Sequence, residues 1–206
     1  RFYGKFALIP VLEPRNQQEA YDMIFDAFAL SEKYRLPVLF RITTRLAHSR
    51  AAVATREKLP QKGVALPLNP RQFVLLPAIA RKQYRALTGV YEQLRKEPAL
   101  NDRNRLVNGN TGGTGVITCG IAYNYLMENI ADNAADYNVL SVAAYPVERE
   151  KVAALVEKCD RVLVLEEGYP LIEEQLRGLL DRDVRVMGRM DGTVPRDGEL
   201  NPSVVA

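Results

Sequence analysis

The fold is decided by four short apolar runs, Val116-Ile-Thr-Cys119, Tyr137-Asn-Val-Leu-Ser-Val142, Arg161-Val-Leu-Val-Leu165 and Asp183-Val-Arg-Val-Met187. Each run has the length and the β-branched content of a strand that is buried in a sheet. The segments between the runs carry apolar residues at helical spacing, and we expect helices over about 120–131, from Pro146 onward, and over 171–180. This alternation of strands and helices predicts an α/β fold with a Rossmann-like parallel sheet and flanking helices, over residues 106–206.

A shorter piece with the order strand, helix, strand precedes this sheet and occupies residues 1–55. The apolar run Phe6–Leu12 predicts a strand, with Pro10 at its end or at a sheet edge. The β-rich run Val38–Thr43 predicts a second, buried strand. Two strands joined by a helix within about forty residues imply a right-handed crossover onto a parallel sheet.

The helix of this piece is predicted from its N-cap signal. Asn16 precedes Glu19 by three residues, close to a capping box, and the helix is expected to end near Tyr34, before the Arg35-Leu-Pro37 break. The residues expected to face the core are Ala20, Ile24, Ala27 and Phe28.

Residues 56–105 are expected to form a connector. Several prolines exclude one continuous element over its first part. Over 77–97, however, apolar residues recur in steps of four and three, which predicts an amphipathic helix whose stripe needs a partner: Ala80, Tyr84, Leu87, Tyr91 and Leu94.

Composition excludes several classes of function. The formal charge of +3 and the lack of a dense basic stripe give no case for nucleic-acid binding. The apolar runs are far shorter than the ~20 residues of a membrane span. The chain starts at Arg1 without a Met or a signal peptide, so we expect a piece of a longer cytoplasmic protein. Cys119 and Cys159 predict buried free thiols, with a disulfide as the alternative, and one His with two distant Cys predicts no metal site.

A glycine-rich loop, Asn108–Gly115, resembles a phosphate-binding loop at first sight. That chemistry requires the glycines between a strand and the helix after it, whereas these glycines come before a strand. A flexible approach loop is therefore the favoured interpretation. Gly112, Gly113 and Gly115 are kept as candidates for an interface.

Glu166 and Glu167 follow the predicted strand Arg161–Leu165, at the sheet edge where ligands and partners meet open α/β folds. Adjacent residues of a strand point to opposite faces, so the two carboxylates are not expected to form an acid–base dyad. A turn with solvated or paired glutamates is favoured over catalysis, and both residues are interface candidates.

The block from Arg41 to Arg50 lies just beyond a predicted strand end and contains the single histidine, His48. A lone His titrates near neutrality and could act as a base, but a polar surface residue is the favoured interpretation. The arginines of the block, with two threonines, could hold an anion or equally form a salt-bridge cluster.

Four stretches of the first 49 residues resemble the indolepyruvate:ferredoxin oxidoreductase α subunit: Pro10–Pro14, Gln18–Met23, Ala27–Lys33, and Leu36–Arg45 with His48-Ser49. Further on, Val164–Gly168 and Ile172–Gln175 resemble the transketolase-C-terminal-like domain of that family. The resemblance implies that residues 1–55 are the C-terminal part of a pyrimidine-binding domain for thiamine diphosphate.

The resemblance also implies an enzyme that oxidatively decarboxylates arylpyruvates to aryl-acetyl-CoA, using thiamine diphosphate, Mg²⁺, iron–sulfur clusters and CoA. The implied partners are the rest of the α subunit, a β subunit and ferredoxin. This piece alone is expected to be structural, inactive and free of cofactors. The cofactor-binding candidates that the resemblance suggests are Arg1, Arg41, Thr43, Thr44, Arg45 and His48.

Two other hypotheses stay open. The first is a free-standing nucleotide- or CoA-binding Rossmann-like domain, which the misplaced glycines disfavour. The second is an oligomerisation module, which the amphipathic helix motivates and which includes a homo-oligomer.

Overall fold

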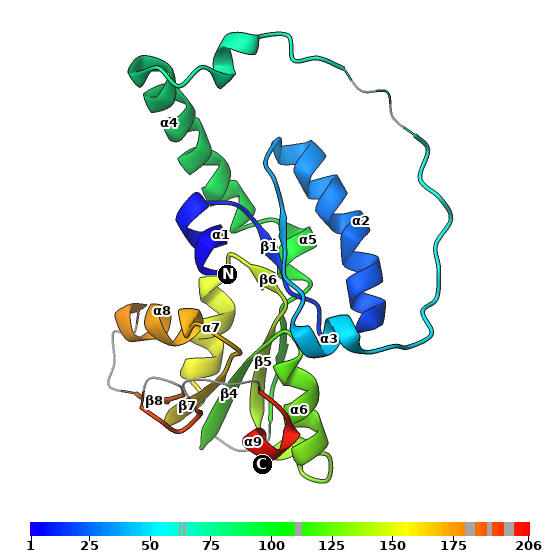
Figure 1. Cartoon of the computed structure of the whole chain (residues 1–206). Coiled ribbons are helices and arrows are strands. Elements are labelled where there is room, and N and C mark those ends of the chain that lie inside the picture. The colour runs from blue at the N-terminus through cyan, green and yellow to red at the C-terminus, as the bar shows by residue number, and fades with distance from the viewer. Residues whose placement is uncertain (62, 64, 110–112, 180–183, 189–190, 196–199) are drawn as a thin grey trace.

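The computed structural model describes residues 1–206 except 62, 64, 110–112, 180–183, 189–190 and 196–199 (Figure 1). Its larger sheet has the strand order β3-β5-β4-β7-β8, in which β5, β4, β7 and β8 are parallel and β3 is antiparallel to β5. The predicted parallel sheet is therefore confirmed. Its strands are β3 (Arg105–Val107), β4 (Thr114–Cys119), β5 (Asn138–Val142), β7 (Arg161–Leu165) and β8 (Arg185–Met187).

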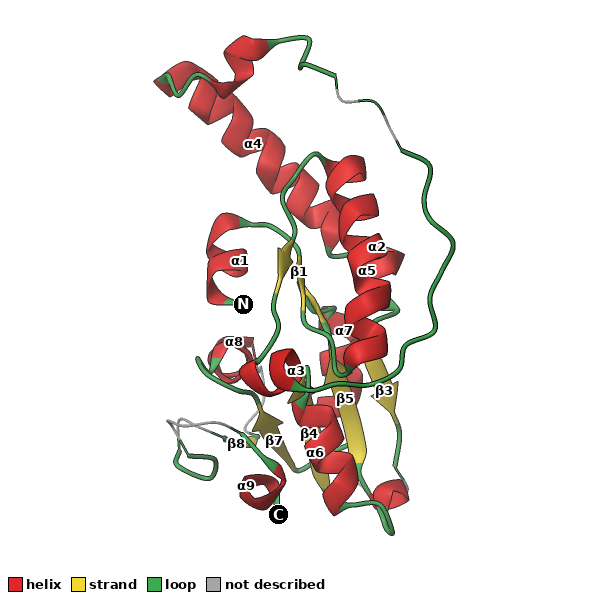
Figure 2. Ribbon diagram, turned by 45° about the vertical axis from the view of Figure 1, so that its right-hand side comes forward, coloured by secondary structure: helices red, strands yellow, loops and turns green. Residues whose placement is uncertain are grey.

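Helices cover both faces of this sheet because alternate residues of each strand point to opposite sides. In β4, Ile117 packs into the cluster of α7 and α8, whereas its neighbour Val116 packs into the cluster of α6. In β5, Leu140 and Val139 divide in the same way. Figures 1 and 2 show these two layers. The helices are α6 (Ala122–Asn129), α7 (Arg149–Val156), α8 (Leu171–Leu179) and α9 (Pro202–Val205), with the short η2 (Ala134–Asp136) after α6. Pro146, expected to open a helix, lies three residues before α7.

A smaller sheet joins the N-terminal piece to the residues that follow β5. Its order is β2-β1-β6, with β1 (Val11–Leu12) parallel to β2 (Leu39–Phe40) and antiparallel to β6 (Ala144–Tyr145). Because β6 follows directly after β5, the N-terminal piece is docked on the larger sheet by backbone hydrogen bonds. A shared apolar cluster, to which Leu12, Met23, Leu94 and Ala144 belong, lies beneath this joint.

The first predicted strand is partly wrong. Phe6 and Ala7 end the helix α1 (Phe2–Ala7), and only Val11 and Leu12 pair as a strand. Leu8 closes α1 with a left-handed backbone (φ 57°), so the chain becomes extended only after that turn. The second strand is likewise shorter than predicted, since it pairs along β1 for two residues, and both of them are half-buried.

The helix α2 (Gln17–Tyr34) begins and ends where the sequence predicts, and the Asn16 side chain accepts a hydrogen bond from the Glu19 amide at 2.9 Å. Its predicted core stripe is wrong in part, because Ile24 and Phe28 are 40% and 67% exposed. The helix instead buries Glu19, Met23 and Leu30.

A buried ionic network explains why α2 turns Glu19 towards the core. The Arg15 side chain, 2% exposed, donates to the Glu19 carboxylate at 2.7 Å and to Ser141 Oγ on β5 at 2.8 Å. Pairing with Arg15 lets a carboxylate occupy the inward-facing stripe, which a count of apolar residues cannot anticipate.

The connector leads away from both sheets and back. After α3 (Thr44–His48) come η1 (Pro70–Phe73), the helix α4 (Pro77–Leu94) and α5 (Pro98–Asn101). The predicted amphipathic helix is confirmed, but only the C-terminal end of its stripe is packed: Leu94 is buried, whereas Tyr84 is 63% exposed. Among the residues that the structure describes, no helix is long and apolar enough to cross a lipid bilayer.

Candidate functional site

Charged side chains are buried where the N-terminal piece meets the carboxyl ends of β4 and β7. Arg1 Nη1 lies 3.1 Å from Glu166 Oε2, and Arg1 Nε lies 3.7 Å from Glu13 Oε2. The same guanidinium donates to the carbonyl oxygens of Glu167 and Tyr169, the latter at 3.0 Å. We call the set Arg1, Glu13, Arg41, Tyr145 and Glu166 the ionic junction.

Glu13 is the hub of the ionic junction and is 1% exposed. Besides Arg1, its carboxylate is paired with Arg41 and accepts a hydrogen bond from the Tyr145 hydroxyl at 2.9 Å. Arg41 also donates to the Glu167 carbonyl at 3.1 Å. A buried carboxylate paired with two guanidinium groups and a hydroxyl is suited to holding elements together, because these partners compensate for the water that it loses.

Gly120 makes room for this hub. Its φ of +55° is in the left-handed region, and a Cβ added there would lie 2.7 Å from Glu13 Cγ. A larger residue at this turn after β4 would therefore displace the carboxylate.

Glu166 fixes the start of α8. Its two carboxylate oxygens accept hydrogen bonds from the Ile172 and Glu173 amides at 3.1 and 3.0 Å, two of the unpaired N–H groups of a helix N-terminus. Burial raises the pKa of Glu166, and Arg1 together with the two amides opposes that shift. Burial likewise raises the pKa of the Cys119 thiol, to about 12, and that of Tyr145 well above its ordinary value.

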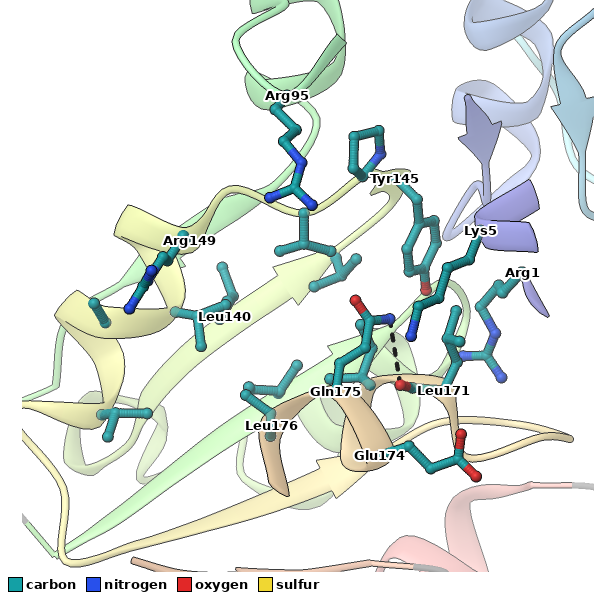
Figure 3. A pocket seen from close by; sticks show the side chains of 18 of the residues that line it. Arg1, Lys5, Arg95, Leu140, Tyr145, Arg149, Leu171, Glu174, Gln175 and Leu176 are labelled. Carbon is teal, nitrogen blue, oxygen red and sulfur yellow. Dashed lines mark hydrogen bonds between the residues drawn. The ribbon is translucent and has the colours of Figure 1, made fainter. Parts of the chain in front are cut away.

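A cavity of about 630 Å³ adjoins the junction on the face of the sheet that carries α7 and α8. Its floor is apolar and includes Leu140, Leu171 and Leu176. Figure 3 shows Arg95 and Arg149 toward one end of this cavity and Lys5 with Arg1 toward the other. Glu157 and Glu174 also line the cavity, so its apolar floor lies among charges of both signs, with four basic and two acidic side chains.

The sequence candidates separate into two groups. The structure brings Arg1, Arg41 and Glu166 together in the junction, with the Glu167 backbone. Within the rest of the block, Thr44–His48 form α3: Thr44, Arg45 and His48 are exposed, and the Arg45 guanidinium lies 5.7 Å from the centre of the Tyr125 ring.

Thr43 precedes α3 and is buried. Its Oγ1 has no hydrogen-bond partner among the described residues. The side chain therefore does not cap the helix that follows it.

The glycine candidates do not share one surface. Gly113 has open space around its Cα, whereas Gly115 is buried in β4, where an added Cβ would lie 2.7 Å from Cys159 Sγ. Gly115 thus permits close packing against the segment after α7. Gly112 lies outside the described residues. Both cysteines are free and buried, as predicted.

Sequence reasoning missed Glu13 and Tyr145 as members of the site. The signal for Glu13 was present: a carboxylate directly after an apolar strand and before Pro14 cannot reach solvent easily. Tyr145 carried no comparable signal, because its role depends on the pairing of β6 with β1.

The chain is similar along its whole length to curated proteins named indolepyruvate oxidoreductase subunit IorA. It is 35% identical over 212 residues to the relative from Methanothermobacter marburgensis, and the matched region covers 100% of this chain and 34% of that relative. The relative from Archaeoglobus fulgidus is 34% identical over 207 residues, which is 98% of this chain and 32% of the relative. The chain thus spans about a third of the length of the curated relatives it matches.

The fold resembles that of a solved 2-oxoglutarate:ferredoxin oxidoreductase from Magnetococcus marinus, with a TM-score of 0.61 and 15% identity over 87% of this chain and 38% of that one. No family model matches the chain.

Proposed function

We propose that this chain, which is related along its whole length to about a third of the indolepyruvate oxidoreductase subunit, serves in a cytoplasmic enzyme that oxidises 2-oxo acids. The end-to-end similarity to that subunit is the observation that supports the proposal. The reaction would be the oxidative decarboxylation of arylpyruvates to aryl-acetyl-CoA. Thiamine diphosphate with Mg²⁺ and iron–sulfur clusters would be the cofactors, and a β subunit and ferredoxin the partners.

The role that we assign to the chain itself is organisational. Residues 1–55 would complete a pyrimidine-binding domain, 56–105 would connect, and 106–206 would form the transketolase-C-terminal-like domain. The ionic junction supports this role, since it joins the first of these parts to the third through Arg1, Glu13 and Glu166. Its charged side chains pair with one another, and Arg1, Arg41 and Glu166 also hold backbone groups.

The described residues do not fit the metal cofactors. No group of three or more His, Cys, Asp or Glu side chains among them could hold a metal ion. The two cysteines are buried, in β4 and after α7, so iron–sulfur ligands would come from other parts of the enzyme. Any contact of this chain with thiamine diphosphate would fall to the exposed side chains of α3, Thr44, Arg45 and His48.

The test is catalytic. The complete subunit, assembled with its partner subunit, should reduce a low-potential viologen dye when indolepyruvate and CoA are supplied together. The 206-residue chain should not reduce the dye under the same conditions. Lack of reduction by the assembled enzyme with any aryl or alkyl 2-oxo acid would contradict the proposal.

The cavity favours a second candidate function, the binding of CoA or a nucleotide by this chain alone. Its apolar floor and its excess of basic over acidic lining residues match such ligands, and the Magnetococcus marinus structure has coenzyme A bound. A thermal-shift series with CoA, NAD and thiamine diphosphate separates these ligands, because a ligand at 100 times its Kd adds about 2.7 kcal/mol to the free energy of unfolding. CoA stabilisation that is lost in Arg149→Gln, but kept in the exposed-site control Arg35→Gln, would support it.

A further inference from the structure

The part of the connector that lies farthest from both sheets exposes many large apolar side chains. Residues 66–85, which we call the apex surface, run through η1 and the first half of α4. Figure 1 shows them at the end of the molecule away from both sheets. Seven of the sixteen large apolar side chains exposed in the described part of the chain lie here, among them Leu66 (91% exposed), Leu75 (87%) and Phe73 (72%). Contiguous exposed apolar residues mark sites that a partner covers.

The charge of the apex surface is one-sided. Arg71, Arg81, Lys82 and Arg85 are all exposed, and no Asp or Glu occurs between residues 66 and 85. The remaining 24 basic and 25 acidic residues leave the rest of the chain with a formal charge of −1. The apex surface is therefore a separate basic feature.

From these observations we infer that the apex surface docks onto a different subunit of the oxidoreductase, at a site that is apolar in its centre and lined by carboxylates at its rim. The inference rests on the proposed function, because it takes this chain to work inside a multi-subunit enzyme. The apolar side chains would provide the buried centre, and the four basic residues would select an acidic partner and orient it.

A second copy of the chain fits this surface poorly. A two-fold interface would bring the same four positive charges of each copy against those of the other, and like charges across an interface are unfavourable.

A bilayer also fits poorly. A helix lying in a membrane surface buries its whole apolar face. The C-terminal half of the α4 face is already packed, since Leu94 belongs to the buried cluster that contains Leu12 and Leu30, and the half-buried Val90 and Tyr91 pack against that cluster. Only η1 and the first turns of α4 remain available, which is an area suited to a protein pocket.

The experiment compares hydrogen exchange in the complete subunit alone and in the assembled oxidoreductase, together with the Kd between the subunits. Two variants are used, Leu75→Asp in the apolar centre and Arg81→Glu at the basic edge. Phe28→Asp and Lys96→Glu are matched controls, exposed on α2 and just after α4. Circular dichroism checks that every variant folds, and the exposed position of Arg81 keeps the test valid if Leu75→Asp fails.

We expect residues 66–85 to be protected in the assembly, and both test variants to weaken assembly at least about ten-fold while the controls do not. The Arg81→Glu effect should shrink as salt rises from about 0.05 M to about 0.5 M, because salt screens exposed charges. Unprotected residues 66–85, or unchanged Kd values in both variants, would overturn the inference. So would residues 66–85 that are already protected in the complete subunit alone, or that are covered by a second copy of the subunit or by anionic vesicles. Dye reduction by the wild-type assembly, measured alongside, reports separately on the proposed function.

Discussion

Arg1 and Glu166 come from opposite halves of the chain, yet Arg1 Nη1 lies 3.1 Å from Glu166 Oε2 and the two side chains are 3% and 1% exposed. The same carboxylate accepts the first amide hydrogen bonds of α8. One buried group therefore ties the start of the N-terminal piece to the turn between β7 and α8.

Removing this carboxylate should be costly. Glu166→Ala removes the nearer of the two carboxylates that pair with Arg1 and leaves two amides of α8 without an acceptor. We expect it to lower the free energy of unfolding by about 3–5 kcal/mol, the usual cost of breaking a buried ion pair from one side. Urea denaturation measures this. Glu174→Ala, one turn into the same helix and exposed, is the control and should change stability by about 0.5 kcal/mol.

The dependence of stability on pH should carry two opposite signs. Burial raises the pKa of Glu166 above 4.5, so the folded state holds this proton more tightly than the unfolded state. Its contribution is complete below pH 4.5 and is lost as the pH rises through the raised value. The free energy of unfolding of the wild type should therefore fall relative to that of Glu166→Gln as the pH rises from 4.5 towards neutrality. Unfolding curves of the two proteins at each pH measure this difference.

Glu19 provides the opposite case. Burial would raise its pKa, but hydrogen bonds and the charge of Arg15 lower it below the ordinary value of 4.5. Its contribution is present above pH 4.5 and is lost as the pH falls through the lowered value. Glu19→Gln should thus destabilise the protein near neutrality and lose its effect in acid. If the stabilities of Glu19→Gln and Glu166→Gln, each relative to the wild type, changed with pH in the same direction, the two environments would not be as described.

Substitution of Gly120 should disturb the hub of the junction. A side chain at φ +55° costs about 1–2 kcal/mol on its own, and the added Cβ would also press on Glu13 Cγ. Gly192→Ala is the matched control, since Gly192 has a φ of +84° but nothing within 4 Å of an added Cβ. We expect Gly120→Ala to lower the melting temperature clearly more than Gly192→Ala. Equal effects would mean that the contact with Glu13 is unimportant.

The Cys119 thiol should be unreactive in the folded protein. Burial raises its pKa to about 12, so the reactive thiolate is nearly absent at pH 8. Cys159 is also buried. A thiol-specific chromogenic reagent should therefore label neither cysteine in the native state and both in urea. Rapid native labelling that disappears in Cys119→Ser would contradict the buried position of this side chain.

The four parallel strands could be predicted because each is a local apolar run, and length and period suffice to recognise such runs and the helices between them. The short antiparallel strand β3 at the edge of the sheet was not predicted. The small sheet was beyond such reasoning. Its strands have two residues each, and β6 is defined only by its pairing with β1, far away in the sequence. The buried face of α2 was predicted wrongly for a related reason, because Glu19 faces inward only when Arg15 neutralises it.

The site, like the fold, could be predicted only in part. Arg41 and Glu166 stand at strand ends, where the topology of a parallel sheet gathers polar groups, and both were candidates. Their common partner Glu13 was not, since the meeting of β1 with the turn at Gly120 depends on how the two parts dock.

The most direct test of the organisational role is a calorimetric titration of thiamine diphosphate with Mg²⁺ into the 206-residue chain and into the complete subunit assembled with its partner. The account predicts saturable binding by the assembly and only heat of dilution with the chain. Tight binding by the chain alone would contradict it and would direct attention to Thr44, Arg45 and His48 on α3.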